Sequence, residues 1–188
     1  MARRAPSRIA LGVVVAMLAV VPLSACATDA PAAGGGSALT LAQVKSPVQL
    51  LRNSAAGRID KSAIDEVKAP TDQSQACKGL DVDPKSLYRT WVSGVLILLK
   101  YDEATRPPAI QTQIIRSFTD QGWKVGDSPS TKITHLEKAT TFATIDISNT
   151  DIDKTFKVEG QIQINVYGAC VLTGGPTSPE VTKLEKVG

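Results

Sequence analysis

The chain has 188 residues, of which 43% are hydrophobic and 4% aromatic, and its formal net charge at pH 7 is +3. Arg3, Arg4 and Arg8 account for that excess, which leaves 18 of the 21 Lys+Arg residues against 18 Asp+Glu residues in the remainder. This length has room for a single hydrophobic core, which must be mostly aliphatic. The balanced charge of the remainder argues against a nucleic-acid-binding surface.

The first 26 residues have the form of a secretory signal. The three arginines precede an uncharged apolar run from Ile9 to Val21, and Leu23-Ser24-Ala25-Cys26 follows. This end resembles the lipobox of bacterial lipoproteins. The resemblance implies cleavage before Cys26, a diacylglycerol on its thiol, and a lipid anchor on the extracytoplasmic face of the cell membrane. An uncleaved membrane span is the alternative, but the apolar run of about fifteen residues is shorter than the roughly twenty that a span needs.

These features divide the chain into a signal peptide at 1–25, a flexible tether at 26–40 and one globular domain at 41–188. The tether is rich in Gly and Ala and cannot bury enough apolar area to offset the entropy of ordering it. About fourteen such residues span roughly 20 Å on average. We therefore expect the domain to stay near the membrane without being held against it.

The region from 41 to 86 predicts two short helices and a loop. Ser46-Pro47 provides an N-cap serine and a proline at the first helical position, and Gly57 is placed to end that helix in the left-handed conformation. A second helix is expected to begin at Ser62 and to end at Pro70. The polar segment 71–86 predicts a loop.

An α+β pattern follows. The apolar run from Trp91 to Leu99 predicts a strand that is covered on both faces, and Pro107-Pro108 opens a helix. With Gly122 in the left-handed conformation past the end of that helix, Trp123 should pack on Phe118 as in a Schellman motif. The helix carries an apolar stripe at Ile110, Ile114 and Phe118.

Beyond Gly122 the hydrophobic residues alternate, which predicts strands at 123–125, at Thr134 to Ser148 and at 156–166. In the second of these, one face carries Ala143, Ile145 and Ile147, and the other carries Thr144, Asp146 and Ser148. The last strand has a dry face at Phe156, Val158, Ile162, Ile164 and Val166, and a wet face at Lys157, Glu159, Gln161, Gln163 and Asn165. One wet face is typical of an antiparallel sheet with helices on one side. The pattern predicts an α+β two-layer sandwich, with about four strands in the sheet and the two short helices before it.

Two cysteines remain after Cys26. Disulfides form outside the cytoplasm, and Cys170 is in phase with the dry face of the last strand, so the sequence predicts a bridge from Cys77 to Cys170. The alternative is two free thiols, one of them reactive. A catalytic thiol needs a neighbouring base, and His135 is the only histidine.

Chemical motifs are scarce. His135 is expected at the surface or at a strand edge, and one histidine cannot build a histidine-rich metal site. Two acidic pairs, Asp81 with Asp83 and Asp151 with Asp153, lack the spacing of a calcium loop and predict solvated turns. The sequence predicts no cofactor, no metal site and no catalytic residue.

The layout of the chain resembles that of small lipoproteins of high-GC Gram-positive bacteria, with a lipobox, a Gly/Ala-rich tether, a helix ending in Gly-Trp and late alternating strands that reach Ala169-Cys170-Val171. This resemblance implies a location and no activity. We expect a non-enzymatic binding or accessory module of the cell envelope, with the wet face of the last strand as the candidate binding surface. The alternative is a carrier of an apolar ligand in a cavity between helix and sheet. A hydrolase is a third possibility, which the lack of histidines disfavours.

Overall fold

The computed structural model describes residues 39–100, 106–130, 132–151 and 160–186. The described residues form one compact unit. Cys26, the predicted signal peptide and almost all of the predicted tether lie outside the described residues. The helices are α1 (Leu41–Ala56), the 3-10 turn η1 (Lys61–Ala63), α2 (Pro107–Thr119) and α3 (Pro179–Glu185). The strands are β1 (Ile64–Val67), β2 (Thr71–Ala76), β3 (Tyr88–Leu99), β4 (Lys124–Val125), β5 (Ile133–Glu137), β6 (Thr144–Thr150), β7 (Gln161–Tyr167) and β8 (Val171–Leu172).

The strands form one antiparallel sheet in the order β1-β3-β7-β6-β5-β4, and β2 and β8 also pair with β3. The predicted α+β class with an open antiparallel sheet is confirmed. The expected number of about four strands is wrong, because the described residues alone form a sheet of eight strands. β3 is the longest strand in the described part of the chain, and most of its residues are buried. It pairs with β1, β2, β7 and β8, so neighbouring strands flank both of its edges.

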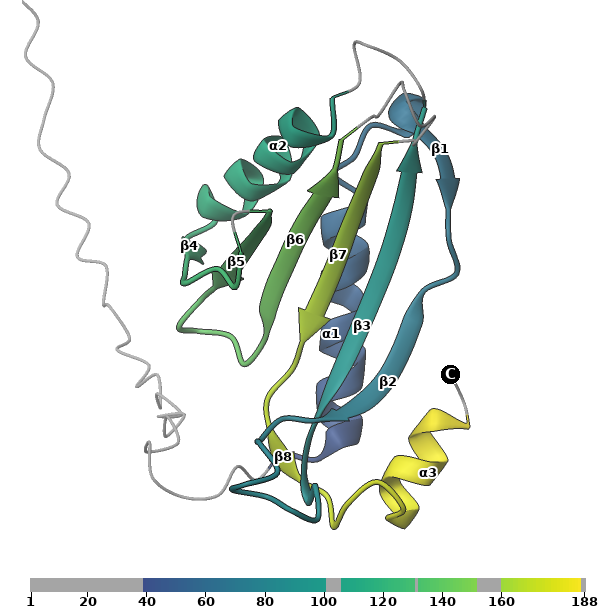
Figure 1. The fold of residues 1–188 in the computed structure, drawn as a ribbon, viewed down its shortest axis with the longest axis vertical. Helices are drawn as coiled ribbons and strands as arrows, with labels where there is room; N and C mark the ends of the chain where they lie inside the picture. The colour runs from purple at the N-terminus through teal and green to yellow at the C-terminus, as the bar shows by residue number, and fades with distance from the viewer. Residues whose placement is uncertain (1–38, 101–105, 131, 152–159, 187–188) are drawn as a thin grey trace, which may run out of the picture. The chain divides into compact units, whose positions relative to one another are not determined.

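In the described part of the chain, α1 packs on β3 and β7, α2 packs on β6 and β7, and α3 contacts β2 and α1. The side chain of Gln111 on α2 reaches Thr134 and the carbonyl of Ile147, while α1 and α2 contribute Val44, Val48, Ile114 and Phe118 to the hydrophobic core. The sheet supplies Ile145, Ile147, Ile162, Ile164 and Val166 to that core, all fully buried. Figure 1 shows α1 running behind β3 and β7. The core is therefore mostly aliphatic, as the composition predicts, and it lies on one side of the sheet.

α1 begins six residues before the predicted helix start. Thr40 is its N-cap and forms a capping box with Gln43, in which each side chain bonds the other residue's backbone N–H. Pro47 lies inside the helix on an exposed position. Gly57 follows the helix with φ −65°, so the prediction of a left-handed glycine there is wrong.

The second predicted helix is absent, and the predicted loop at 71–86 is partly a strand. Asp60 caps the short turn η1 by accepting from the backbone N–H of Ser62, after which the chain forms β1 and β2 along the edge of β3. β2 shows no apolar alternation, because the residues that face the helices are polar. These residues, Asp72 and Ser74, form hydrogen bonds there in place of apolar packing. Propensity and periodicity could not reveal a strand of this kind.

The predicted strand from Thr134 to Ser148 is two strands, β5 and β6, that form a hairpin. The turn between them is held by Thr141, whose backbone N–H and hydroxyl both donate to the carbonyl of Lys138. This turn contains no Gly, Pro, Asn or Asp, which are the usual sequence signals of a turn. The predicted phase of Ala143, Ile145 and Ile147 is confirmed, because all three are buried.

The end of α2 has the predicted Schellman geometry. Gly122 has φ +83°, its N–H donates to Thr119, and the N–H of Trp123 donates to the carbonyl of Phe118 at 3.1 Å. The rings of Phe118 and Trp123 meet edge to face with their centroids 5.4 Å apart. The α-to-β switch at Gly122 therefore follows from the sequence as expected.

We expect Gly122→Ala to lower the free energy of unfolding by roughly 1 kcal/mol, because a Cβ is unfavourable in the left-handed region. No atom lies within 4 Å of the position of that Cβ, so the loss would come from the backbone conformation alone. Gly57→Ala is the matched control, since Gly57 has an ordinary helical φ. Denaturant midpoints of residues 38–188 measure both effects, and an unchanged midpoint for Gly122→Ala would contradict the assignment.

The predicted disulfide is present. Cys77 and Cys170 are bonded with their Cα atoms 5.8 Å apart, across a sequence separation of 93 residues. The phase argument for Cys170 is wrong, however, because β7 ends at Tyr167 and Cys170 lies exposed in the connection to β8. The bridge joins the end of β2 to that connection.

α3 covers the outer edge of β2. The carboxylate of Glu185 accepts from the backbone N–H of Ser74 at 3.2 Å and from its hydroxyl at 2.6 Å. The guanidinium of Arg89 donates to the Ser74 carbonyl. Both backbone polar groups of Ser74 are thus satisfied by side chains at this edge of the sheet.

Candidate functional site

The face of the sheet that is turned away from the helices carries mostly polar side chains, and we call it the polar face. It consists of the outward side chains of β2, β3, β7, β6 and β5. Its centre is a row of five residues that are successive partners across these strands, which we call the polar row. The row runs His135, Asp146, Asn165, Gly94, Thr71.

His135 and Asp146 are joined by a short side-chain contact within the polar row. His135 Nδ1 lies 2.6 Å from Asp146 Oδ1, and the two side chains are 24% and 18% exposed. The backbone N–H of His135 donates to the hydroxyl of Ser128, and its carbonyl accepts from Gly126. The imidazole is therefore held on the sheet by a carboxylate on one ring nitrogen, as a positioned hydrogen-bonding group.

Because Gly94 has no side chain, the side chains of Asn165 and Thr71 can lie close to the backbone of the sheet. A Cβ at this position would come within 2.6 Å of Asn165 Oδ1 and 2.8 Å of Thr71 Oγ1. These contacts are closer than real Cβ atoms show, so the amide and the hydroxyl occupy the space that a side chain would need. The middle of the polar row is consequently flat and presents an amide and a hydroxyl.

Tyr167 lies beside the polar row on β7, opposite Thr144 on one side and Val92 on the other. Burial, and secondarily the negative charge of Asp146, raises the pKa of the Tyr167 phenol. The phenol thus keeps its proton at neutral pH and remains available as a hydrogen-bond donor next to Asp146.

The predicted wet face is only partly described. Gln161, Gln163 and Asn165 lie on the polar face, with Gln163 exposed and the other two half-buried. Lys157 and Glu159 lie outside the described residues. The structure adds His135, Asp146 and Tyr167, which the sequence analysis did not connect with one another. The alternation in 134–148 did place Asp146 on a wet face, but strand register, which brings it to Asn165 and His135, cannot be obtained from periodicity.

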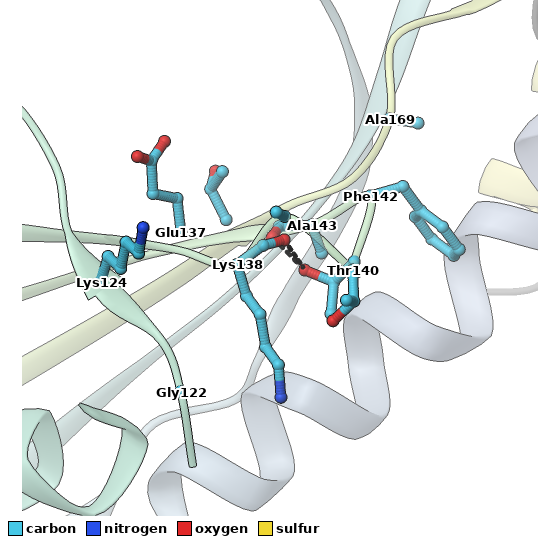
Figure 2. A pocket seen from close by; sticks show the side chains of 11 residues that line it. Gly122, Lys124, Glu137, Lys138, Thr140, Phe142, Ala143 and Ala169 are labelled. Carbon is cyan, nitrogen blue, oxygen red and sulfur yellow. Dashed lines mark hydrogen bonds between the residues drawn. The ribbon is translucent and has the colours of Figure 1, made fainter. Parts of the chain in front are cut away.

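A depression of about 670 Å³ lies at the end of the polar face, around the hairpin turn between β5 and β6. Glu137 and Thr144 are cross-strand partners on the polar face that also line the depression. Lys124 on β4, the other partner of Glu137, lines it as well. Figure 2 shows Lys124 and Glu137 on one side of it and Phe142, which is 41% exposed, on the other. Its other lining residues are Gly122, Lys138, Ala139, Thr140, Thr141, Ala143 and Ala169. The polar face therefore ends in a hollow with an aromatic rim.

The apolar stripe of α2 packs on the sheet. Ile114 is fully buried and Phe118 is 1% exposed, and both belong to the same core cluster as Ile145 and Ile147. Gln111 fixes the helix to β6 by donating to the carbonyl of Ile147 at 2.7 Å and by bonding Asn149. A carrier would require this stripe to stand off from the strands, which it does not do.

The described residues hold no cluster of metal-ligating side chains, and the carboxylate of Asp83 binds backbone groups instead. No group of three or more His, Cys, Asp or Glu side chains that could hold a metal ion is found among them. Asp83 accepts from the backbone N–H groups of Tyr88 and Leu87, and these bonds, chiefly that from Tyr88, lower the pKa of its carboxyl group.

Within the described residues, no helix is of a length and apolarity that would let it cross a membrane.

Comparisons with protein-family models, with curated proteins and with solved structures found no match to this chain. What can be concluded about its role therefore depends on the geometry of the polar face and on the N-terminal sequence.

Proposed function

We propose that the protein is a lipid-anchored, non-enzymatic binding module on the outer face of the cytoplasmic membrane, and that it binds a polar envelope partner through the polar face. The observation that supports this most is the polar row, in which hydrogen-bonding groups from four strands flank a glycine on the side of the sheet without helices. An open antiparallel face of this kind can serve as a platform.

Binding fits the row better than catalysis does. Asn165, Thr71 and Tyr167 offer donors and acceptors in fixed positions, and His135 is oriented by Asp146. The groups lie on a flat surface, whereas catalytic groups usually converge in a cleft that excludes water. The hollow at the hairpin turn would admit a protruding group of the partner, between Lys124 and Phe142.

The membrane location rests on the sequence from Arg3 to Cys26. A basic start, an uncharged apolar run and Leu-Ser-Ala-Cys support export followed by lipidation of Cys26. Two acyl chains hold a protein firmly on a bilayer, whereas one holds it only marginally. The balanced charge of the remaining chain makes nucleic acid an unsuitable partner.

One experiment tests both parts of this proposal in cells. A photo-crosslinking amino acid is placed at Gln163, which is exposed on the polar face, and in a control at Ser54, which is exposed on α1. We expect a discrete crosslinked adduct from position 163 and none from position 54. Equal adducts from both positions, or none from 163, would contradict binding through this face.

The second arm adds Cys26→Ala. Without the thiol that would carry the diacylglycerol, the protein is expected to leave the membrane pellet and appear in the soluble fraction. A variant that stays in the pellet through salt and carbonate washing would show that lipid on Cys26 is not the anchor. The two arms are independent, because the face can bind a partner whether or not the anchor is a lipid.

A further inference from the structure

Three apolar side chains project from one end of the sheet. Leu80 and Val82, in the loop between β2 and β3, are 70% and 68% exposed, and Leu172 on β8 is 62% exposed. We call these three residues the apolar tip. A single exposed leucine is ordinary on a protein surface, but large apolar side chains gathered at one end indicate a contact with something apolar.

The covalent and backbone bonds of the fold bring the two segments together. Cys77 precedes the loop and is bonded to Cys170, two residues before Leu172. Leu172 is the cross-strand partner of Tyr88, and the N–H of Thr173 donates to the carbonyl of Leu87 at 2.9 Å. Figure 1 shows the loop and β8 side by side at the lower end of the sheet.

The loop is also held in a fixed shape. The N–H groups of Val82 and Asp83 both donate to the carbonyl of Gly79, at 3.0 and 2.8 Å. The carboxylate of Asp83 accepts from the N–H of Leu87 at 2.9 Å and of Tyr88 at 2.8 Å. Because these bonds fix the backbone, Leu80 and Val82 are presented to the outside instead of folding back onto the domain.

The domain begins at the same end. In the first turns of α1 the N–H of Ala42 donates to Glu180, and Lys45 donates to the carbonyl of Leu184 and lies over the ring of Trp91. Val44 lies against Gly168, which follows β7 and leads toward β8. The sequence places only about fourteen residues, with an average span of roughly 20 Å, between Cys26 and this end.

We propose that the apolar tip inserts into the lipid interface of the membrane that anchors the protein, and so sets the orientation of the domain on the bilayer. This inference rests on the proposed lipid anchor at Cys26. An anchor on a short tether keeps the tip at a high effective concentration next to the bilayer, so that weak insertion is sufficient. The polar face then stays in water beside the membrane.

The net charge of the loop predicts which lipids the apolar tip would insert into. Lys78 and Lys85 are balanced by Asp81 and Asp83 between the two ends of the loop. Insertion is therefore expected to depend on apolar contact and to occur in bilayers of zwitterionic phosphatidylcholine, which have no net charge. Strong dependence on anionic lipid would be the behaviour of a basic patch, which this loop does not contain.

The test uses the full, lipidated protein in phosphatidylcholine vesicles with brominated acyl chains. The bromine atoms quench the fluorescence of a tryptophan that lies among the acyl chains. Val82→Trp and Leu172→Trp report on the tip, and Leu50→Trp, at a 66% exposed position on α1, is the matched control. The native Trp91 and Trp123 are 0% and 6% exposed and give the same background in every variant. We expect loss of the added emission at 82 and 172 and no loss at 50.

Each outcome decides one question. If the protein pellets with the vesicles but positions 82 and 172 are not quenched, the tip does not insert, and the lipid anchor stands. Quenching at 50 equal to that at 82 shows that the domain has no fixed orientation, which also overturns the inference. If the protein does not pellet, the anchor itself is wrong, and insertion of the tip falls with it.

Discussion

Replacing Cys77 and Cys170 together by serine is expected to lower the free energy of unfolding of the domain by roughly 4 to 5 kcal/mol. The bridge closes a separation of 93 residues, from the end of β2 to the connection before β8. In the chain-entropy model, a loop this long removes many conformations from the unfolded chain. The loss is a large fraction of the roughly 5 to 15 kcal/mol that typically stabilises a domain.

Denaturant midpoints of residues 38–188 measure this loss. Cys77→Ser alone should lower the midpoint about as much as the double replacement, because either change removes the bridge. Wild-type protein with and without reductant provides the matched control in an unchanged sequence. Identical midpoints for the oxidised and reduced wild type would show that the bridge does not stabilise the domain.

Arg52→Ala is expected to cost roughly 3 to 5 kcal/mol, because it leaves a nearly buried carboxylate without its partner. Arg52 Nη1 donates to Asp72 Oδ2 at 2.8 Å and to the hydroxyl of Ser93 at 2.7 Å, and the two charged side chains are 9% and 13% exposed. The indole of Trp91 donates to the other carboxylate oxygen. This cluster joins α1 to β2 and β3.

The acid dependence of stability identifies Asp72 as the group concerned. Burial raises its pKa, but hydrogen bonds from Ser93, Trp91 and Arg52, with the charge of Arg52, outweigh burial and leave the pKa below its ordinary value of 3.8. A carboxyl group with a lowered folded-state pKa stabilises the protein above its unfolded-state pKa, and this contribution is lost as the pH falls through the folded-state pKa. The cost of Arg52→Ala should therefore be fully present at neutral pH and should shrink below about pH 4.

Two controls separate the pair from simple loss of packing. Asp72→Asn should remove most of this acid dependence, and Arg52→Leu combined with Asp72→Leu should cost less than Arg52→Ala, because no unpaired charge remains. A cost of Arg52→Ala that is the same at pH 3 and pH 7 would assign it to lost packing instead.

The elements that could be predicted are those whose signal is local. Pro107, Gly122 and Trp123 define both ends of α2, and the alternation of Ile162, Ile164 and Val166 defines β7. Each depends on residues close in sequence, so periodicity and capping rules apply directly. The capping box at Thr40 and Gln43 is a local signal for the start of α1, whereas the helix-start pattern at Ser46-Pro47 lies inside the helix.

The elements that could not be predicted depend on distant partners. β2 contains Asp72, Gln73, Ser74 and Gln75 and is a strand because β3 pairs with it and because Arg52, Arg89 and Glu185 satisfy its polar side chains. The polar row has the same origin. His135, Asp146 and Asn165 lie far apart in the sequence and become neighbours only through strand register.

The hydrogen bonds from Ser74 to Glu185 bear on whether copies of this protein associate with one another. An exposed strand edge with free N–H and C=O groups is a template on which another chain can add a strand, and this is a common route to aggregation. The proposed lipid anchor at Cys26 would confine many copies to one plane, where such encounters are frequent. A chain that ends before Pro179 would expose Ser74 and the polar edge of β2 to its neighbours. α3 thus covers an edge that could otherwise add a strand, and we expect a truncation that removes it to lower solubility before it affects the polar face.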